Sequence, residues 1–331
     1  MKLIKLCAIG GDGIGPDVLE SGLKVLKKLV PEIEIKFEIA GYGAYQKHGR
    51  SLPDHTLQTC RNSDVILFGA VTTPPLIKNY QSPIIRIRQE LNLYANVRPF
   101  FSLPIKDTCR DIDLLIIREN TQGLYSGIEK KIDGGFSAER IITKKASERI
   151  LSFAFSYAQK RRKKVTVIHK ANILRLTDGL FLSLAKKMAK KYPQVECNDM
   201  LVDTCAFQLI KNPQSFDVIV TTNMFGDILS DEVAGLIGGL GVCASANIGP
   251  HNALFEPVHG SAPKYAGQDK VNPMAMLFAV CMMLDYLSLR QEADLLRKTT
   301  ITAIKKGNVT YDLGGKYKTS EVVNYIMNNI K

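Results

Sequence analysis

Two acidic side chains are spaced in a way that suits metal binding. Asp227 and Asp231, in the run VIVTTNMFGDILSDEVAG, are four residues apart, so a helix that follows the apolar run would place both carboxylates on one face. Like charges at this spacing repel unless a cation lies between them, although two solvated acids on an amphipathic helix give the same pattern. Carboxylate oxygens favour Mg²⁺ or Mn²⁺ over zinc. Asp203, in MLVDTC, is a third candidate ligand.

Three arginines could bind the carboxylates of a substrate. Arg88 and Arg98 lie in the run RQELNLYANVRP, and Arg118 ends the apolar run LLIIR. A guanidinium binds a carboxylate through two parallel hydrogen bonds. Most isolated arginines lie at the surface, but a guanidinium at the end of a buried strand requires an anionic partner. We therefore expect Arg118 to face one.

Tyr125 in NTQGLYSG and Lys170 in VIHKANILR are candidate acid–base groups. A metal-bound substrate and neighbouring arginines can lower the pKa of a lysine into a useful range. Each residue, taken alone, also fits a structural or surface role.

The elements that would position these residues alternate between strand and helix, as in an α/β protein with a largely parallel sheet. The strand-like runs are LIKLCAIGG, DVILFGA, DLLIIREN, KVTVIHK and FDVIVTTN, and amphipathic stretches cover residues 17–29, 146–161 and 179–192. Several runs end in polar residues, and open α/β sheets bind ligands at the carboxyl ends of their strands.

A glycine-rich turn, GGDGIGP at residues 10–16, follows the first strand-like run. It lacks the dinucleotide-binding spacing, because GxGxxG counted from Gly11 would need glycine at Pro16. A proline at the first position of the following helix fits a tight turn instead. A Rossmann fold is therefore not expected.

Length and composition are those of a soluble globular protein, with 331 residues that suit two lobes. No apolar run approaches the roughly 20 residues of a membrane span, and the short apolar opening suits a buried strand better than a leader peptide.

Seven scattered cysteines suit reduced thiols, so we expect a cytoplasmic protein. The net charge of +12 suits polyanionic substrates. Its densest run, KRRKK, has no interleaved aromatics, and neither nucleic acid nor membrane is expected as a partner.

From end to end the chain resembles the isocitrate/isopropylmalate/homoisocitrate dehydrogenases, which are β-decarboxylating dehydrogenases. The matching motifs are GGDGIGP, LYANVRP, IIRENTQGLYSG, HKANILRLTDGLF, TTNMFGDILSDEVAGLIGGLG, ANIG, FEPVHGSAP and Asn272–Pro273. The resemblance implies the α/β isopropylmalate dehydrogenase-like fold, which is not a Rossmann fold, with two lobes and a mostly parallel sheet in the large one. Residues 1–93 and 238–331 would form the large cofactor-binding lobe, and 94–237 the small central lobe with the dimer interface.

The same resemblance implies roles for single residues. Tyr125 would protonate the enol left after loss of CO₂, and Lys170 would accept the proton of the substrate hydroxyl. Asp203, Asp227 and Asp231 would hold Mg²⁺ or Mn²⁺. Lys170 and Asp203 would come from the other subunit, which makes a homodimer with shared active sites obligatory. The implied substrate-binding residues are Ser82, Ile84, Ile85, Arg88, Arg98, Arg118 and Asn172.

The cofactor segment implies NADP, with NAD as the alternative. Relatives that use NAD typically carry an aspartate after GSAP, but Lys264 and Tyr265 follow here and look like the pair that NADP enzymes place on the 2′-phosphate. Tyr311 matches a further tyrosine of the NADP enzymes, whereas Gly315 stands where they have an arginine. A cation and phenol hydroxyls suit a phosphate. The implied cofactor-binding residues are Glu256, His259, Gly260, Ser261, Ala262, Lys264, Tyr265, Asn272 and Tyr311.

The substituent on C3 of the substrate is left open by the segment QSPIIRIR. Ser82 matches the serine that isocitrate enzymes use on the third carboxylate, whereas Ile84 and Ile85 match the apolar pair of isopropylmalate enzymes. The string SPII resembles archaeal-type homoisocitrate dehydrogenases, and GLYSGIEKKIDGG resembles isocitrate dehydrogenases. We expect oxidative decarboxylation of isocitrate or homoisocitrate, with 3-isopropylmalate as the alternative. A non-catalytic regulatory subunit of a hetero-oligomeric isocitrate dehydrogenase is an alternative of another class, although every catalytic and metal position is filled.

Overall fold

The computed structural model describes residues 3–75, 77 and 80–330. The chain forms two compact units. The terminal unit comprises Met1–Leu93, Leu103–Thr108 and Gly238–Lys331, and the central unit comprises Tyr94–Ser102 and Cys109–Ile237. This division differs from the expected lobes in one segment, because residues 103–108 pack with the terminal unit.

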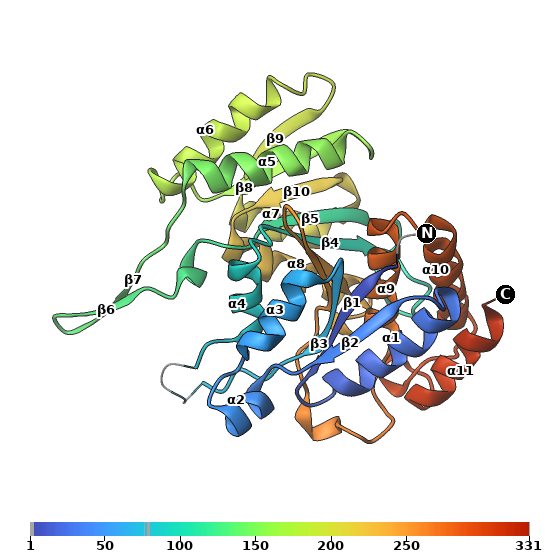
Figure 1. The fold of residues 1–331 in the computed structure, drawn as a ribbon. Coiled ribbons are helices and arrows are strands. Elements are labelled where there is room, and N and C mark those ends of the chain that lie inside the picture. Colours follow the sequence, from blue (N-terminus) through green and yellow to red (C-terminus); the bar gives the residue numbers. More distant parts are fainter. Residues whose placement is uncertain (1–2, 76, 78–79, 331) are drawn as a thin grey trace. The chain divides into compact units, whose positions relative to one another are not determined.

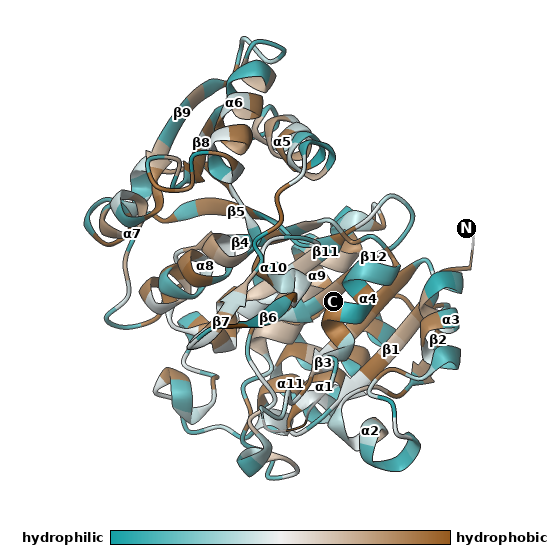
Figure 2. Cartoon of the chain, turned by 90° about the vertical axis from the view of Figure 1, so that its left-hand side faces the viewer, coloured by the Kyte–Doolittle hydropathy of each residue, from teal (hydrophilic) through white to brown (hydrophobic). Residues whose placement is uncertain are grey.

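The strands of the terminal unit follow the order β2-β1-β3-β12-β11, and Figure 1 labels β1, β2 and β3. They are β1 (Lys5–Gly11), β2 (Glu34–Glu38), β3 (Val65–Ala70), β11 (Ala244–Ile248) and β12 (Ala253–Pro257). The first four in spatial order are parallel, and β11 is antiparallel to β12. Every residue of β3 is buried, and the apolar run of β1 is brown in Figure 2, as expected of parallel strands covered on both faces.

The helices of the terminal unit come from both chain ends. They are α1 (Gly15–Leu29), α2 (Tyr42–His48), α3 (Asp54–Asn62), α4 (Pro83–Glu90), α9 (Met274–Tyr286), α10 (Arg290–Lys305) and α11 (Thr319–Asn329). Helix α9 packs on α1, α10, β11 and β12. Its sequence, MAMLFAVCMMLDY, is apolar on nearly every face, and this pattern is typical of a helix buried on all sides.

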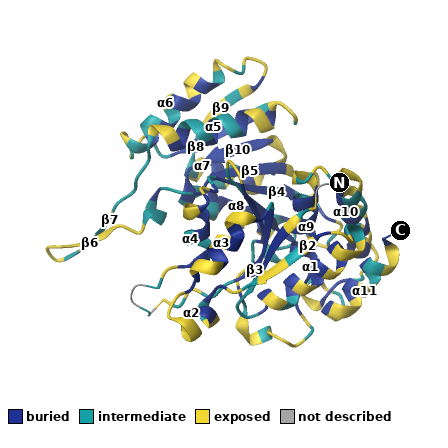
Figure 3. Cartoon of the chain, viewed as in Figure 1, coloured by how far each residue is buried: buried dark blue, intermediate teal, exposed yellow. Residues whose placement is uncertain are grey.

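The strands of the central unit follow the order β4-β5-β10-β8-β9. They are β4 (Ala95–Phe101), β5 (Asp113–Glu119), β8 (Lys164–His169), β9 (Glu196–Leu201) and β10 (Val218–Thr221). Only β4 is antiparallel to its neighbour here. A separate hairpin of β6 (Glu129–Ile132) and β7 (Gly135–Ala138) is largely exposed, as the yellow of Figure 3 shows.

Helices cover both faces of the central strands. They are α5 (Lys144–Ala158), α6 (Thr177–Ala189), α7 (Val202–Lys211) and α8 (Asn223–Ile237). Successive residues of a strand point to opposite faces, and on β5 the side chain of Arg118 contacts α8 whereas Glu119 pairs with Arg149 of α5. Helices α5 and α8 therefore lie on opposite faces, as Figure 1 shows.

All the strand-like runs recognised in the sequence are strands, and the three amphipathic stretches lie in α1, α5 and α6. The glycine-rich turn connects β1 to α1 with Pro16 in its first turn, as predicted. Asp12 in this turn accepts hydrogen bonds from the backbone N–H groups of Tyr42, Gly43 and Thr72. Within residues 3–75, 77 and 80–330, no helix combines the length and the apolar character needed to cross a bilayer.

Candidate active site

The two candidate substrate-binding arginines of the central unit, Arg98 and Arg118, lie on the sheet face that carries α8. Asn96 of β4 is paired with Arg118 of β5, and Arg98 lies two residues from Asn96, so the three side chains share a face. The side chain of Arg118 is only 1% exposed. A guanidinium buried to this degree needs anionic or hydrogen-bonding partners.

Those partners are the acids of α8. Arg98 reaches Asp227 and Asp231 at 3.3 Å each, and Arg118 donates to Asp227 from Nη1. The prediction that Arg118 faces an anion is thus confirmed, as is the placement of the two acids on one helix face. Gly226 permits the close approach of α8 to β5, because a Cβ there would lie 2.7 Å from Cβ and Cγ of Arg118.

Polar residues that the sequence interpretation missed complete this cluster. Asn223 accepts from Nε of Arg118 at 3.0 Å, Asn96 accepts from Nε of Arg98 at 2.9 Å, and Ser230 accepts from Nη1 of Arg98 at 2.6 Å. Asn223 precedes Asp227 by four residues, so the helical spacing that revealed the acids could have revealed it too.

Asp227 and Asp231 form the carboxylate pair of this cluster that is best suited to a divalent cation. Both remain partly accessible to solvent. Burial raises the pKa of Asp231, and the negative charge of Asp227 raises it further against the opposing effect of Arg98. Among the described residues no three of the His, Cys, Asp and Glu side chains gather as a metal site, so one chain does not bring Asp203 to this pair.

Tyr125 joins the same cluster from the turn after β5. Its hydroxyl donates to Oδ2 of Asp227, and the guanidinium carbon of Arg118 lies 5.1 Å from its ring centre. Partial burial raises the pKa of Tyr125, and the hydrogen bond to Asp227 adds to this rise. The phenol therefore holds its proton next to the candidate metal ligands.

Lys170 and Asp203 form a second group in the central unit. Lys170 follows β8, and its Nζ donates to Oδ1 of Asp203 in the first turn of α7. This contact lowers the pKa of Asp203. Asn172 lies in the exposed turn after Lys170.

In the terminal unit, Arg88 is held by a buried carboxylate. Its Nη2 donates to Oε1 of Glu256 at 2.8 Å, and Asn247 donates to the same oxygen at 2.7 Å. Nε of Arg88 is buried without a partner among the described residues. Glu256, expected to contact the cofactor, is therefore already engaged with Arg88.

The amino end of α4 carries the residues expected to choose the substrate. Ser82 precedes Pro83 as the N-cap residue, yet its buried hydroxyl makes no capping hydrogen bond and none to any other described residue. The first-turn N–H groups of a helix also lack intrahelical partners. Ile84 and Ile85 are both partly exposed, and Ile84 also packs against the core cluster around Ile9 and Ile66.

Four of the residues expected to bind the cofactor, namely His259, Tyr265, Asn272 and Tyr311, line a small pocket of about 150 Å³ in the terminal unit. It is lined by Ile14, Gly241, His259, Tyr265, Lys270, Val271, Asn272, Tyr311 and Asp312. His259 has Nδ1 3.0 Å from the carbonyl of Gly260, and its Nε2 is buried without a partner among the described residues. Burial lowers the pKa of His259 and favours the neutral ring, whose Nε2 can accept a hydrogen bond from a ligand.

The segment after GSAP gathers cations and phenols. Nζ of Lys264 lies 4.8 Å from the ring centre of Tyr265, and the rings of Tyr265 and Tyr311 are 6.5 Å apart. The hydrogen bond from Tyr311 lowers the pKa of Tyr265, and Lys264 and Lys270 act in the same direction. The sequence interpretation missed Lys270, although it lies only six residues beyond Lys264.

Residues on both sides of the cofactor segment are fixed by backbone contacts. Asp269, the first acid after GSAP, accepts from the backbone N–H and the hydroxyl of Ser320 and so anchors α11. Gly315 has no room for a side chain, because a Cβ would lie 2.0 Å from the carbonyl oxygen of Val309. The run Gly260–Ala262 lies against the glycine-rich turn, where Ile14 donates to the carbonyl of Ser261 at 2.8 Å.

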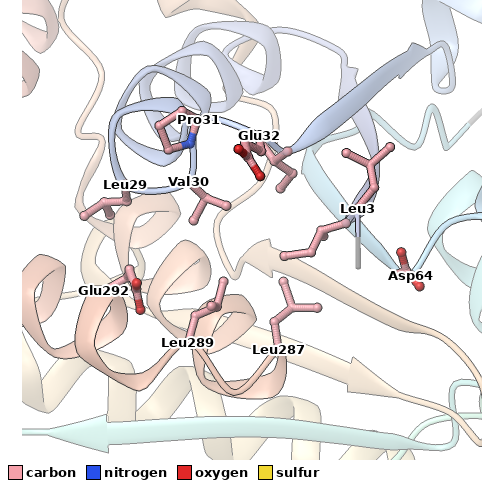
Figure 4. A pocket seen from close by; sticks show the side chains of 11 residues that line it. Leu3, Leu29, Val30, Pro31, Glu32, Asp64, Leu287, Leu289 and Glu292 are labelled. Atoms are coloured by element: carbon pink, nitrogen blue, oxygen red, sulfur yellow. The ribbon is translucent and has the colours of Figure 1, made fainter. Parts of the chain in front are cut away.

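A different pocket of about 690 Å³ opens at the amino ends of β1 and β2 (Figure 4). Apolar side chains such as Leu29, Val30, Leu287 and Leu289 dominate its wall. None of the predicted site residues lines it.

Comparison with known proteins identifies relatives over the whole chain. The family described as "Isocitrate/isopropylmalate dehydrogenase" matches residues 5–326. The homoisocitrate dehydrogenase of Methanocaldococcus jannaschii is 48% identical over 99% of this chain and 98% of its own length. The 3-isopropylmalate dehydrogenase of Methanothermobacter thermautotrophicus is 46% identical over the full length of both. The crystal structure of isocitrate dehydrogenase from Methylococcus capsulatus superposes with a TM-score of 0.95 at 43% identity, covering 99% of each chain.

Proposed function

We propose that the chain oxidises and decarboxylates isocitrate or homoisocitrate with NADP. The chain belongs to the isocitrate/isopropylmalate dehydrogenase family, whose members are NAD(P)-dependent β-decarboxylating dehydrogenases. One observation carries the chemistry. Tyr125 and Arg118 both donate to Asp227, so an acid, a carboxylate-binding cation and a candidate metal ligand meet on one side chain. This is the combination that decarboxylation of a 2-hydroxy acid needs.

Each residue then has a role suited to its position. Arg98 and Arg118 in the central unit, and Arg88 in the terminal unit, bind substrate carboxylates. Lys170 accepts the proton of the C2 hydroxyl as the C2–H bond breaks, and a nicotinamide cofactor would supply the hydride acceptor. A divalent cation at the α8 aspartates would stabilise negative charge on the C2 oxygen. After the C3 carboxylate leaves as CO₂, Tyr125 donates its proton to C3.

A third carboxylate on the substrate is supported by the amino end of α4. The hydroxyl of Ser82 is free of a capping bond, and the N–H groups of the first turn add positive potential beside it. The apolar alternative, 3-isopropylmalate, rests on Ile84 and Ile85. It is the weaker candidate because Ile84 packs on the core of the terminal unit.

NADP is supported by the charge of the cofactor segment. Lys264 lies beside Tyr265, and Lys270 lines the same pocket. We propose that Lys270 supplies the second cation, because the backbone at Gly315 leaves no space for the expected arginine. The acid that could repel a 2′-phosphate, Asp269, is bonded to Ser320. His259 and Asn272, in the same pocket, would bind other parts of the nucleotide.

A homodimer with shared sites would explain why Asp203 lies apart from Asp227 and Asp231. Large apolar side chains are exposed on α7 and α8, namely Phe207, Ile210 and Ile228. Such side chains commonly mark an interface when they gather on neighbouring elements. In this arrangement Lys170 and Asp203 of one subunit serve the other.

Mixing two inactive variants tests the shared site. Lys170→Met and Tyr125→Phe each remove one proposed acid–base group, and a heterodimer of the two keeps one intact site out of two. Random assortment makes half of the dimers heterodimers, so about one quarter of wild-type activity is expected after co-expression. Activity no higher than that of the separate variants would refute sharing.

A substrate panel tests the function itself. Isocitrate, homoisocitrate, 3-isopropylmalate, tartrate and malate are each supplied with NADP or NAD in the presence of Mg²⁺, and nucleotide reduction is followed. We expect the highest kcat/KM with a tricarboxylic substrate and NADP. Preference for 3-isopropylmalate would overturn the role of Ser82, and no turnover with any acid would favour a regulatory subunit.

A further inference from the structure

The backbone at Lys170 is fixed by an aspartate that none of the proposed roles uses. The N–H of Lys170 donates to Oδ2 of Asp178 at 2.7 Å, across the turn between β8 and α6. Asp178 is 0% exposed. A carboxylate buried so completely must be paired, because an isolated buried charge is strongly unfavourable.

Its partner is Arg140. Nη1 of Arg140 donates to Oδ1 of Asp178 at 2.6 Å, so the two carboxylate oxygens are divided between the guanidinium and the backbone of Lys170. The side chain of Arg140 is itself largely buried. Solvent therefore screens the attraction of this ion pair only weakly, and its geometry is fixed.

Arg140 also reaches the start of α8. Nη2 donates to the hydroxyl of Thr222 at 3.0 Å, and the guanidinium carbon lies 5.2 Å from the ring centre of Phe225. The carbonyl of Thr222 accepts the N–H of Gly226, so Thr222 begins the helix that carries Asp227. One guanidinium thus connects the Lys170 turn to the amino end of the acidic helix.

We propose that Arg140 and Asp178 are positioning residues that set the Lys170 turn against the start of α8. This inference rests on the proposed function, in which Lys170 is the base. Neither residue contacts the Lys170 side chain or the substrate-binding arginines in any described contact, so their loss acts on the orientation of Lys170 and not on carboxylate binding. Arginine is required because its planar fork serves Asp178 and Thr222 together, which a single ammonium group cannot do.

Three variants and a matched control test the proposal. Asp178→Asn and Arg140→Gln each break the pair, and Arg140→Lys keeps the charge without the fork. Asp217 is the control: it is 1% exposed and accepts from Nε of Arg161 at 2.8 Å, but it lies before β10, at the opposite end of the strand from Thr222. Asp217→Asn therefore weakens an ion pair of the same unit, with an aspartate as deeply buried as Asp178, without touching the Lys170 turn.

We expect Asp178→Asn and Arg140→Gln to lower kcat by roughly 10- to 100-fold, the effect of misplacing a catalytic group by about 1 Å. KM for the hydroxy acid should change by less than about threefold, since the arginines are untouched. Arg140→Lys should recover part of kcat, and Asp217→Asn should keep wild-type kcat. In the Lys170→Met background, Asp178→Asn should cause no further loss, because both changes act through one group. An equal additional loss there, or a kcat matching that of Asp217→Asn, would overturn the proposal.

Hydrogen exchange supplies a readout that does not depend on turnover. Amides of residues 169–176 should exchange faster in Asp178→Asn and Arg140→Gln than in wild type and in Asp217→Asn. Unchanged exchange would overturn the positioning role even if activity fell. If these two variants exchange faster than wild type but wild type turns over no hydroxy acid, the contact stands and the proposed function is refuted instead.

Discussion

A methyl group at Gly226 should damage catalysis more than folding. The Cβ of Gly226→Ala would lie 2.7 Å from two carbons of Arg118, about 1 Å closer than an ordinary carbon–carbon contact. Relief requires either α8 or Arg118 to shift by about that amount. Overpacking of this kind costs about 1–3 kcal/mol, and the higher helix propensity of alanine offsets up to about 1 kcal/mol. The net loss of stability should be about 0–2 kcal/mol.

The same shift moves Arg118 and Asp227 relative to each other, and a displacement of about 1 Å can lower the rate by up to about 100-fold. Gly235→Ala is the matched control, because it lies in the same helix and its Cβ meets nothing within 4 Å in the described structure. It should keep kcat/KM and gain about 0.5–1 kcal/mol. Steady-state kinetics at saturating Mg²⁺ and urea unfolding measure both effects. Equal kcat/KM for the two variants would show that the close contact does not set the site.

The other predictions concern the metal, the substrate and the cofactor. Excess EDTA should abolish turnover, and added Mg²⁺ or Mn²⁺ should restore it; full activity without metal would remove Asp227 and Asp231 from the ligand set. Ser82→Ala should lower kcat/KM for a tricarboxylic substrate by about tenfold while leaving 3-isopropylmalate unaffected, which kinetics with both acids would measure. Lys264→Asp should shift the ratio of kcat/KM values from NADP toward NAD, whereas the equally charged change Lys298→Asp on α10 should not. A wild-type preference for NAD would contradict the assignment of Lys264.

Much of the fold could be predicted from residue patterns within single strands and helices. Buried parallel strands are nearly continuous apolar runs, so five of them, including β1 and β3, were visible in the sequence. The strands that were not recognised lack such runs. β9, at one edge, reads ECNDML and is mostly exposed, and β4 contains Arg98 and Pro99. Their strand conformation depends on pairing with a neighbour, which local sequence does not encode.

For the cofactor segment, too, the sequence predicted one part of the site and the structure revealed the rest. Residue types alone indicated a phosphate near Lys264 and Tyr265, because charge complementarity needs no coordinates. Only the folded chain brings Lys270 into the same pocket and shows that Asp269 is bonded to Ser320. Only the structure gives a physical reason for glycine at position 315, because the carbonyl of Val309 leaves no room for the expected arginine.

The sequence by itself determined which side chains are candidates to bind a metal, bind a carboxylate or transfer a proton, and which of them share a helix face. Tertiary structure decided how those groups are held. Asn223 accepts a hydrogen bond from Arg118, which lies 105 residues away in the sequence, and Asp178 joins Arg140 to the backbone of Lys170; no spacing rule predicts these partners. Helical and strand periodicity reach only a few residues along the chain, whereas burial makes most polar groups pair with whichever partner the fold brings near them.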